Sequence, residues 1–481
     1  MRFSDHAYCL SQIASDAANV VIDSTARYPE APPSPIEEYR DATAKRASRT
    51  STNSVETTRT ALGRTLQLHR FSMTMEVGVS LHRAIELTSR LTLVREDETI
   101  PLITASGRTL FEDLRSMVDD PRFDNSAMDG WAVREVDCKE VGAILRIVGT
   151  SQAGSEEIPT VDAGEACRIM TGAPLPQGAD AIVMVEDSIV VGDKVTIDGP
   201  ARPSFIRWKG ENLTHDTVAL RAGTVLTPAS VSLAATMGHA NIRVVRKPNI
   251  AVIGVGDELT PPGEHLSESS IYESNTFGLS SLVEKMGGTP RRFDLIKDSM
   301  DLLRETLDEA AASCDAILTS GGVSMGEWDM VRRIMEEEGD IRFWKVMIRP
   351  GGPPLFGSWR GKPIFGLPGN PVSSHIVFTV LVAPWMSSSM GSEEGTRPRL
   401  ANRVRVEMEE SLMGAPGKVC MRRISIRQEG HKLLGSTRTH QGSGNIHSMV
   451  AHNGLSLLPP DSDCQEAVSY THLTLPTILL V

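Results

Sequence analysis

The chain has 481 residues and a mass of 52.2 kDa, and 40% of its residues are hydrophobic. A chain of this size holds roughly three or four domains and can bury a substantial core. Its formal net charge is −12 and it has no sustained run of Lys and Arg, which argues against a nucleic-acid-binding surface. An anionic ligand would therefore need a local basic site.

The cysteines and the apolar runs narrow the class of protein further. Six cysteines are scattered without any C-x-x-C pair, so neither a zinc site nor a disulfide framework is indicated. No stretch reaches the roughly 18–20 apolar residues of a membrane span, and the N-terminus does not resemble a signal peptide. We expect a cytoplasmic protein that binds neither nucleic acid nor membrane.

Residues 1–74 differ in composition from the rest of the chain. Ser, Thr, Ala and Arg dominate, "YPEAPPSP" breaks any helix, and the apolar periodicity is weak. We expect a disordered segment, or an extension upstream of a true start at Met73 or Met75. Helical spacing of apolar residues begins in "VSLHRAIELTSRL", where the folded part should start.

Two patterns follow along the chain. Residues 122–211 carry short β-like runs, "AILRIVG", "AIVMVED" and "KVTIDG", separated by Gly, Pro and Asp, which predicts a small β-rich domain. Next, "LTPASVSLAATMGHANIRVVRK" predicts a helix followed by a strand.

From residue 249 strands and helices alternate. The strands are "NIAVIGV", "RRFDLI", "DAILTS" and "PIFGL"; the helices are "ESNTFGLSSLVEKMG", "SMDLLRETLDEAAASC", "WDMVRRIMEEEG" and "PVSSHIVFTVLVAPW". This alternation predicts a doubly wound, mostly parallel α/β sheet. Ligands of such sheets bind beyond the carboxyl ends of the strands, so the residues just after each strand matter most.

Glycines, prolines and carboxylates follow the predicted strands. They are Gly256-Asp257-Glu258-Leu259, Lys297-Asp298, Gly321-Gly322-Val323-Ser324 with Asp329, and Leu367-Pro368-Gly369-Asn370-Pro371. A Gly-Gly turn can point backbone N–H groups at an anion, and Ser373 adds a hydroxyl at a helix start. Each residue alone could be an ordinary cap or turn residue, but their joint occurrence predicts a site for a nucleotide or oxyanion with Mg²⁺.

"FDNSAMDGWAV", residues 123–133, holds an unusual carboxylate. Turn chemistry explains its Asn, Ser and Gly, but not Asp129 between Met128 and Gly130.

Five motifs in order, "FDNSAMDGWAV", "MTGAPLPQGADAIVMVED", "GDEL", "TSGGVSMGEWD" and "GLPGNPVSS", resemble the molybdopterin molybdenumtransferase family, the MoeA and gephyrin E-domain group. The resemblance runs from about residue 77 to residue 466. It implies an α/β multidomain protein with an elongated domain, an inserted β-rich domain, a MogA-like molybdopterin-binding α/β domain and a C-terminal β-barrel-like domain. The implied ranges are 75–121 with 212–248, 122–211, 249–395 and 396–467, in that order.

The same resemblance implies a reaction and an assembly. Molybdate replaces AMP on adenylylated molybdopterin to give the molybdenum cofactor, and a molybdopterin adenylyltransferase is the implied upstream donor. A head-to-tail homodimer would place each active site between the α/β domain of one subunit and the β-rich domain of the other. Asp129 and Thr171 would then serve the site of the neighbouring subunit.

Roles for individual residues also follow from the resemblance. Glu258, Asp298 and Asp329 match catalytic acids that would hold Mg²⁺. Ser324 matches a serine that contacts the oxyanion, and Arg423 falls where the C-terminal domain contributes a basic residue. The implied substrate-binding set is Gly321, Gly322, Ser324, Pro368, Gly369, Asn370, Pro371, Ser373, Arg349 and Arg423.

The chain departs from the family pattern in two places. Where K-P-G-K-P is usual, Arg349 replaces the first lysine and Gly352 the second, so we expect weak molybdate binding unless Arg349 or Lys345 compensates. The end, "VSYTHLTLPTILLV", has no family counterpart, and "VSYTHL" resembles a translated sequencing adapter. We therefore expect residues 468–481 to be an artefact, with the native C-terminal strand missing.

Two alternative functions stay open. The first is the same reaction with tungstate, an oxyanion of nearly equal size and charge. The second is a non-catalytic, gephyrin-like scaffold, which would need the dimer and a peptide groove but no acids. The acids Asp129, Glu258, Asp298 and Asp329 favour an enzyme.

Overall fold

The computed structural model describes residues 75–297, 299–323, 329–394, 396, 398–437 and 440–461, and the strand at 470–474. The predictions for residues 1–74, for Asp298 and for Ser324 lie outside these residues, as do those for 468, 469 and 475–481. Within the described residues no helix is both long enough and apolar enough to cross a bilayer.

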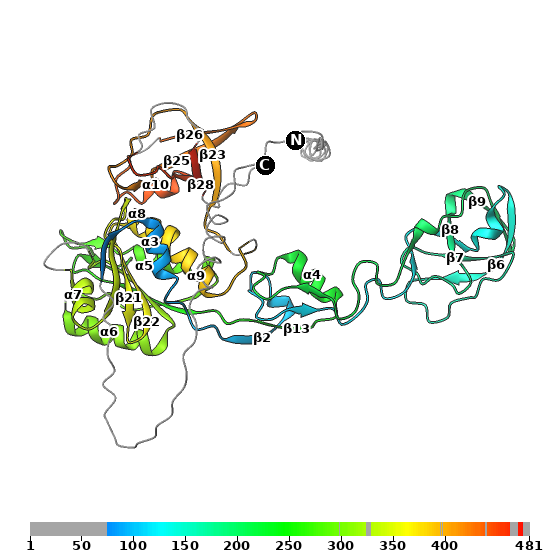
Figure 1. The fold of residues 1–481 in the computed structure, drawn as a ribbon, viewed down its shortest axis with the longest axis horizontal. Helices are drawn as coiled ribbons and strands as arrows, with labels where there is room; N and C mark the ends of the chain where they lie inside the picture. The colour runs from blue at the N-terminus through cyan, green and yellow to red at the C-terminus, as the bar shows by residue number, and fades with distance from the viewer. Residues whose placement is uncertain are drawn as a thin grey trace, which may run out of the picture. The chain divides into compact units, whose positions relative to one another are not determined.

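The largest sheet has seven strands and is mostly parallel, as predicted (Figure 1). Only β21 runs antiparallel to its neighbours β19 and β22. The sheet order is β1 (Glu76–Val79), β19 (Asp340–Val346), β21 (Leu355–Trp359), β22 (Lys362–Leu367), β18 (Ala316–Ser320), β14 (Asn249–Gly254) and β17 (Thr289–Arg292). The sequence predicted strands β14, β18 and β22. It also predicted β17, which begins two residues earlier in the structure than expected. Strands β1, β19 and β21 were not predicted.

Helices cover both faces of this sheet (Figure 1). On one face lie α3 (Leu81–Thr88), α5 (Asn275–Lys285), α8 (Pro371–Val377) and α9 (Ala383–Ser389). On the other lie α6 (Met300–Ser313) and α7 (Met330–Glu337). The predicted last helix is α8 joined to α9 through one π-helical stretch, Phe378–Val382.

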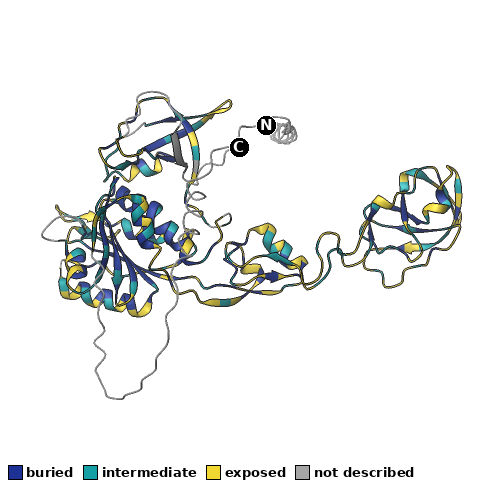
Figure 2. Cartoon of the chain, viewed as in Figure 1, coloured by how far each residue is buried: buried dark blue, intermediate teal, exposed yellow. Residues whose placement is uncertain are grey.

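Burial of the strands on both sides explains their continuous apolar runs (Figure 2). In β14, Ile250 and Val252 pack on the core under α5, whereas Ala251 and Ile253 pack on the core under α6. Alternate residues of a strand face opposite sides, so a two-sided core needs an apolar residue at every position.

The range predicted to be β-rich, residues 122–211, contains a separate sheet. Its six-stranded sheet has the order β8 (Ala181–Met184), β5 (Gly130–Val133), β7 (Glu165–Ile169), β6 (Ala143–Ser151), β10 (Lys194–Ile197) and β9 (Ser188–Val191). Gly130 is required in β5, because a Cβ there would lie 1.9 Å from the Val183 carbonyl oxygen.

The segments on either side of this unit pair with each other. Strand β2 (Asp97–Pro101) pairs with β13 (Asn241–Val245), and helix α4 (Pro228–Thr236) precedes β13 as predicted. The first part of the predicted elongated domain, β1 with α3, instead joins the large sheet through β19. The domain boundaries themselves stay predictions.

The C-terminal strands close into a barrel, in line with the implied β-barrel-like domain. They are β23 (Asn402–Met408), β26 (Lys432–Ser436), β25 (Arg423–Glu429), β27 (Gly454–Ser456) and β28 (Tyr470–Thr474). Strand β28 falls in the segment assigned to a sequencing adapter. Its pairing with β23 and β27 does not address the origin of these residues, so that assignment stays a prediction.

Phe365 lies at the centre of an aromatic row in the core of the large sheet. Its ring centroid is 4.5 Å from that of Phe356 and 5.0 Å from that of Trp385. We predict that Phe365→Ala lowers the free energy of unfolding by about 3–5 kcal/mol, because the cavity cannot collapse between packed rings. Denaturant titration measures this loss. Ile103→Ala, at a side chain that is 89% exposed, is the control and should change little; equal effects would contradict this account of the core.

Candidate active site

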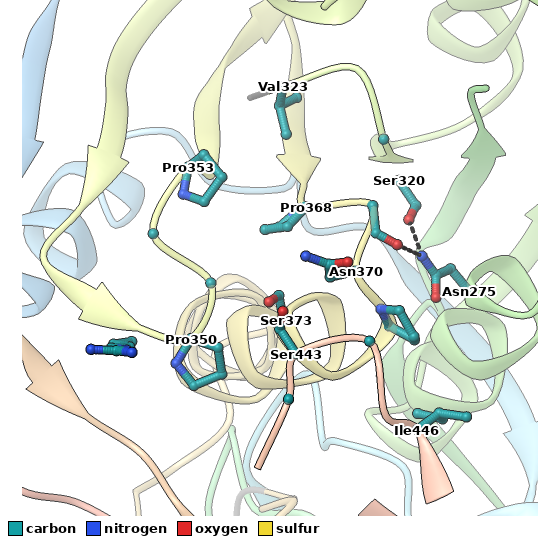
Figure 3. A pocket seen from close by; sticks show the side chains of 18 of the residues that line it. Asn275, Ser320, Val323, Pro350, Pro353, Pro368, Asn370, Ser373, Ser443 and Ile446 are labelled. Carbon is teal, nitrogen blue, oxygen red and sulfur yellow. Dashed lines mark hydrogen bonds between the residues drawn. The ribbon is translucent and has the colours of Figure 1, made fainter. Parts of the chain in front are cut away.

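A cavity of about 1200 Å³ lies beyond the carboxyl ends of β14, β18 and β22 (Figure 3). The loop after β20 (Ile348–Arg349) and two segments of the C-terminal part, 415–423 and 441–446, complete its wall. Most residues predicted for the site line this cavity: Glu258, Gly321, Gly322, Asp329, Arg349, Pro368, Gly369, Asn370, Pro371, Ser373 and Arg423. Asp298 and Ser324 lie outside the described residues.

The Gly-Gly loop after β18 packs closely on the end of β14. Gly321 has φ +98°, and a Cβ there would lie 2.3 Å from the Val255 carbonyl oxygen. The Gly321 N–H donates to the Leu367 carbonyl at 3.0 Å. The Gly321 N–H is therefore not available to a ligand. Among the described residues the Gly322 N–H has no acceptor, so of the two N–H groups predicted to point at an anion only that of Gly322 can do so.

Asn275, at the start of α5, joins two strand-end loops (Figure 3). Its side-chain N–H₂ group donates to the Ser320 hydroxyl at 2.8 Å and to the Gly369 carbonyl at 2.7 Å. These bonds hold the loops after β18 and β22 together. Sequence reasoning missed this residue, although its place at a helix start beside the predicted rim was a usable signal.

Carboxylates occupy the α/β side of the cavity. Asp329 precedes α7 at the N-cap position, and its side chain makes no capping hydrogen bond to that helix. Buried Glu273 accepts hydrogen bonds from the Thr276 N–H at 2.6 Å and hydroxyl at 2.7 Å, which gives it a structural role. Among the described residues no three His, Cys, Asp or Glu side chains form a metal-binding cluster. Glu258 and Asp329 are thus the described members of the expected Mg²⁺ set.

Four basic side chains also line the cavity, and we call Arg349, Lys418, Arg422 and Arg423 the basic wall. Arg423 is only 1% exposed. Its guanidinium donates to the Ser448 hydroxyl and to the Gly442 carbonyl, each at 3.0 Å. Burial, and secondly the neighbouring Arg422 charge, lowers the pKa of Arg423. No carboxylate among the described residues pairs with it, so its site favours an anionic ligand.

Only one of the two predicted substitutes for the missing lysine reaches the cavity. Arg349 lines it. Lys345 does not, because its ammonium lies 4.1 Å from the centroid of the Trp344 ring. Gly352 also lines the cavity, and a Cβ there would make ordinary contacts, 3.5 Å to the Ile348 carbonyl oxygen and 3.8 Å to that of Val346. A side chain therefore fits at position 352.

Asp129 and Thr171 contact each other in the β-rich unit. The Thr171 N–H and hydroxyl donate to one Asp129 carboxylate oxygen at 2.7 Å and 3.0 Å. The backbone N–H of Thr171 is the main cause that lowers the pKa of Asp129. Neither residue is among those that line the cavity of the same chain. The pair thus presents a fixed anionic carboxylate on another part of the molecule.

Two family descriptions match most of the folded chain. Residues 79–238 match the MoeA N-terminal region (domain I and II), and residues 251–388 match a probable molybdopterin binding domain.

Curated relatives and solved structures agree with these matches. The chain is 32% identical over 407 residues to the molybdopterin molybdenumtransferase of Nostoc sp.. The aligned region covers 82% of this chain and 92% of that protein. It is 36% identical over 318 residues to that of Haemophilus influenzae, across 65% of this chain and 78% of the relative. The crystal structure of a molybdopterin biosynthesis MoeA protein from Pyrococcus horikoshii superposes with a TM-score of 0.72 at 27% identity, across 82% of this chain and 100% of the other.

The close packing of Gly321 can be tested against a neighbouring glycine. We predict that Gly321→Ala lowers the free energy of unfolding by about 1–3 kcal/mol, because the new methyl group meets a carbonyl and the backbone stays left-handed. Gly369→Ala is the control, since its Cβ would have only a 3.6 Å contact with the Gly321 Cα. Thermal unfolding of both variants measures the difference. Equal stability of the two variants would show that the loop is not held as described.

Proposed function

The chain belongs to the molybdopterin molybdenumtransferase family, and we propose that its strand-end cavity is the place where molybdate replaces AMP on adenylylated molybdopterin. The protein is a transferase of molybdenum cofactor biosynthesis that inserts molybdenum. One observation supports this cavity above all: it is lined by carboxylates and by the nearly buried Arg423, which has no carboxylate partner among the described residues. Such polarity suits a substrate with several anionic groups and a divalent cation.

The basic wall would bind the anionic oxygens of molybdate and of the phosphoanhydride. Arg423 is held by Ser448 and Gly442, so the orientation of its guanidinium is fixed before a substrate binds. The Gly322 N–H would add a backbone donor, and Asn275 would keep the two loops around the substrate at a fixed spacing.

Mg²⁺ would be held by Glu258 and Asp329, with Asp298 as the third expected ligand. Two protein carboxylates plus substrate phosphate oxygens are a usual set for this ion, so the described residues fit it. When bound, Mg²⁺ would neutralise the charge that develops on the phosphoanhydride as AMP leaves.

We also infer a homodimer in which Asp129 and Thr171 of one subunit complete the site of the other. Two observations support this. The pair does not line its own chain's cavity, and its carboxylate is held in the charged form without a cation bonded to it. We place the reaction in the cytoplasm, with a molybdopterin adenylyltransferase as the donor of the substrate. Tungstate is a second candidate oxyanion, since the basic wall recognises charge and shape that both oxyanions share.

A non-catalytic scaffold is the less favoured alternative. A groove that only binds a peptide gains nothing from a nearly buried guanidinium without a carboxylate, because the desolvation of that charge is costly. The arrangement around Arg423 therefore favours an enzyme.

Asp329 provides the first test of the proposed site. We predict that Asp329→Asn keeps the fold but reduces AMP release at least about a hundredfold, because the uncharged amide cannot hold Mg²⁺. Purified protein is incubated with adenylylated molybdopterin, Mg²⁺ and molybdate, and AMP is followed over time. Asp193→Asn, at an exposed carboxylate outside the cavity, is the matched control. Turnover of Asp329→Asn near that of the wild type would refute the assignment.

Mixed dimers test the shared site. A subunit with Asp129→Asn and a subunit with Asp329→Asn carry different tags, are co-expressed and are purified through both tags. We predict about half of the wild-type activity, because one of the two composite sites keeps both acids. The converse dimer, one wild-type subunit with one Asp129→Asn/Asp329→Asn subunit, should be inactive. Sites contained within one subunit would give the opposite pair of results.

A further inference from the structure

Lys418 is one of two cations of the basic wall, with the more exposed Arg349, that have no acceptor among the described residues. We propose that its ammonium binds an anionic oxygen of a tetrahedral oxyanion in the cavity, and so replaces the lysine that is missing at position 352. This inference rests on the proposed function. It concerns a residue of the C-terminal part that no sequence motif indicated.

The backbone of Lys418 is fixed by a tight turn. The Lys418 N–H donates to the Ala415 carbonyl at 3.1 Å, with Pro416 and Gly417 between them and Gly417 at φ +64°. Proline followed by a left-handed glycine is the sequence that a type II turn requires. Asp461 accepts the Gly417 N–H at 2.7 Å and holds the turn from outside. The side chain therefore starts from a defined point at the cavity wall.

This turn lies beside the segment that carries Gly352. Strand β24 (Val419–Cys420) runs parallel to β20, and the Val419 N–H donates to the Met347 carbonyl at 2.9 Å. On the same segment the Val346 N–H donates to the Gly352 carbonyl at 2.9 Å. Val419, which follows Lys418, and Gly352 are thus bonded to neighbouring residues of one short stretch, and Lys418 and Gly352 both line the cavity. The flexible four-carbon stem of Lys418 can bring its charge to the space beside Gly352.

The two arginines of the C-terminal part are held by the protein. Arg422 donates through Nε and Nη2 to the Met413 carbonyl, at 3.3 Å and 3.0 Å. Arg423 is held by Ser448 and Gly442. Lys418 is half-buried, and within the described residues its ammonium has neither a carboxylate nor another acceptor. A partly desolvated ammonium in a cavity that two arginines also line gains from an anion, which would offset its desolvation.

Two anions in the reaction share this tetrahedral chemistry, free molybdate and a phosphate group of adenylylated molybdopterin. Kinetics on the full chain separate them. If Lys418 contacts molybdate, Lys418→Gln should raise the molybdate concentration for half-maximal AMP release about tenfold. If it contacts a phosphate group, Lys418→Gln should instead raise the KM for adenylylated molybdopterin about tenfold. Lys418→Arg should keep most of the affinity. Lys432→Gln, the same charge change on the barrel and outside the cavity, should change neither constant.

A second substitution tests whether Lys418 and position 352 serve the same anion. Gly352→Lys in the Lys418→Gln background should restore the affinity, because the glycine backbone accepts a side chain. If Lys418→Gln leaves both constants unchanged while Arg349→Ala raises one of them strongly, Arg349 is the contact and the proposal is overturned.

Direct binding separates this proposal from the proposed function. Calorimetric titration of the full chain with molybdate alone, and with inorganic phosphate alone, requires no turnover. Weaker binding of either ion to Lys418→Gln than to Lys432→Gln would support the contact even if the wild type released no AMP. Equal binding of both ions by the two variants, together with unchanged kinetic constants, would refute the contact.

Discussion

The site depends on one constraint, a positive charge that is nearly completely buried and has no carboxylate partner in the part of the chain that the structure describes. Moving a guanidinium from water into a protein interior costs roughly several kcal/mol, and two hydrogen bonds to neutral groups offset only part of that cost. Arg423 has those two bonds, to Ser448 and Gly442, at the edge of a large cavity. An anion in the cavity would supply the rest, so substrate binding and the local stability of this wall are coupled.

The remainder of the cavity follows from how the chain is arranged around that charge. Parallel strands β14, β18 and β22 bring their carboxyl ends to one edge, where glycines allow close packing and Asn275 joins two loops. The C-terminal part supplies Lys418, Arg422 and Arg423 and β20 supplies Arg349, and β20 with β24 ties the two parts together by backbone hydrogen bonds. Carboxylates and cations therefore line a common space, which is the arrangement that suits a polyanion with a divalent cation.

The sequence predicted the parts of this arrangement that depend on local pattern. The apolar runs of β14, β18 and β22 and the glycines that follow them are local signals, and the structure brings Gly321, Pro368 and Asp329 to one cavity as expected. Strand β1 was missed because its pairing with β19, far along the chain, leaves no local signature. Lys418 was missed for the same reason: only the pairing of β24 with β20 brings its turn to the cavity.

The position of a heavy oxyanion tests the central claim most directly. Crystals of the full chain soaked in tungstate would locate the metal by its anomalous scattering, and tungstate shares the charge and shape of molybdate. The account predicts a tungsten peak inside the cavity, against the basic wall and near Arg423. A peak at another site, with none in the cavity, would contradict the claim that this wall binds the oxyanion.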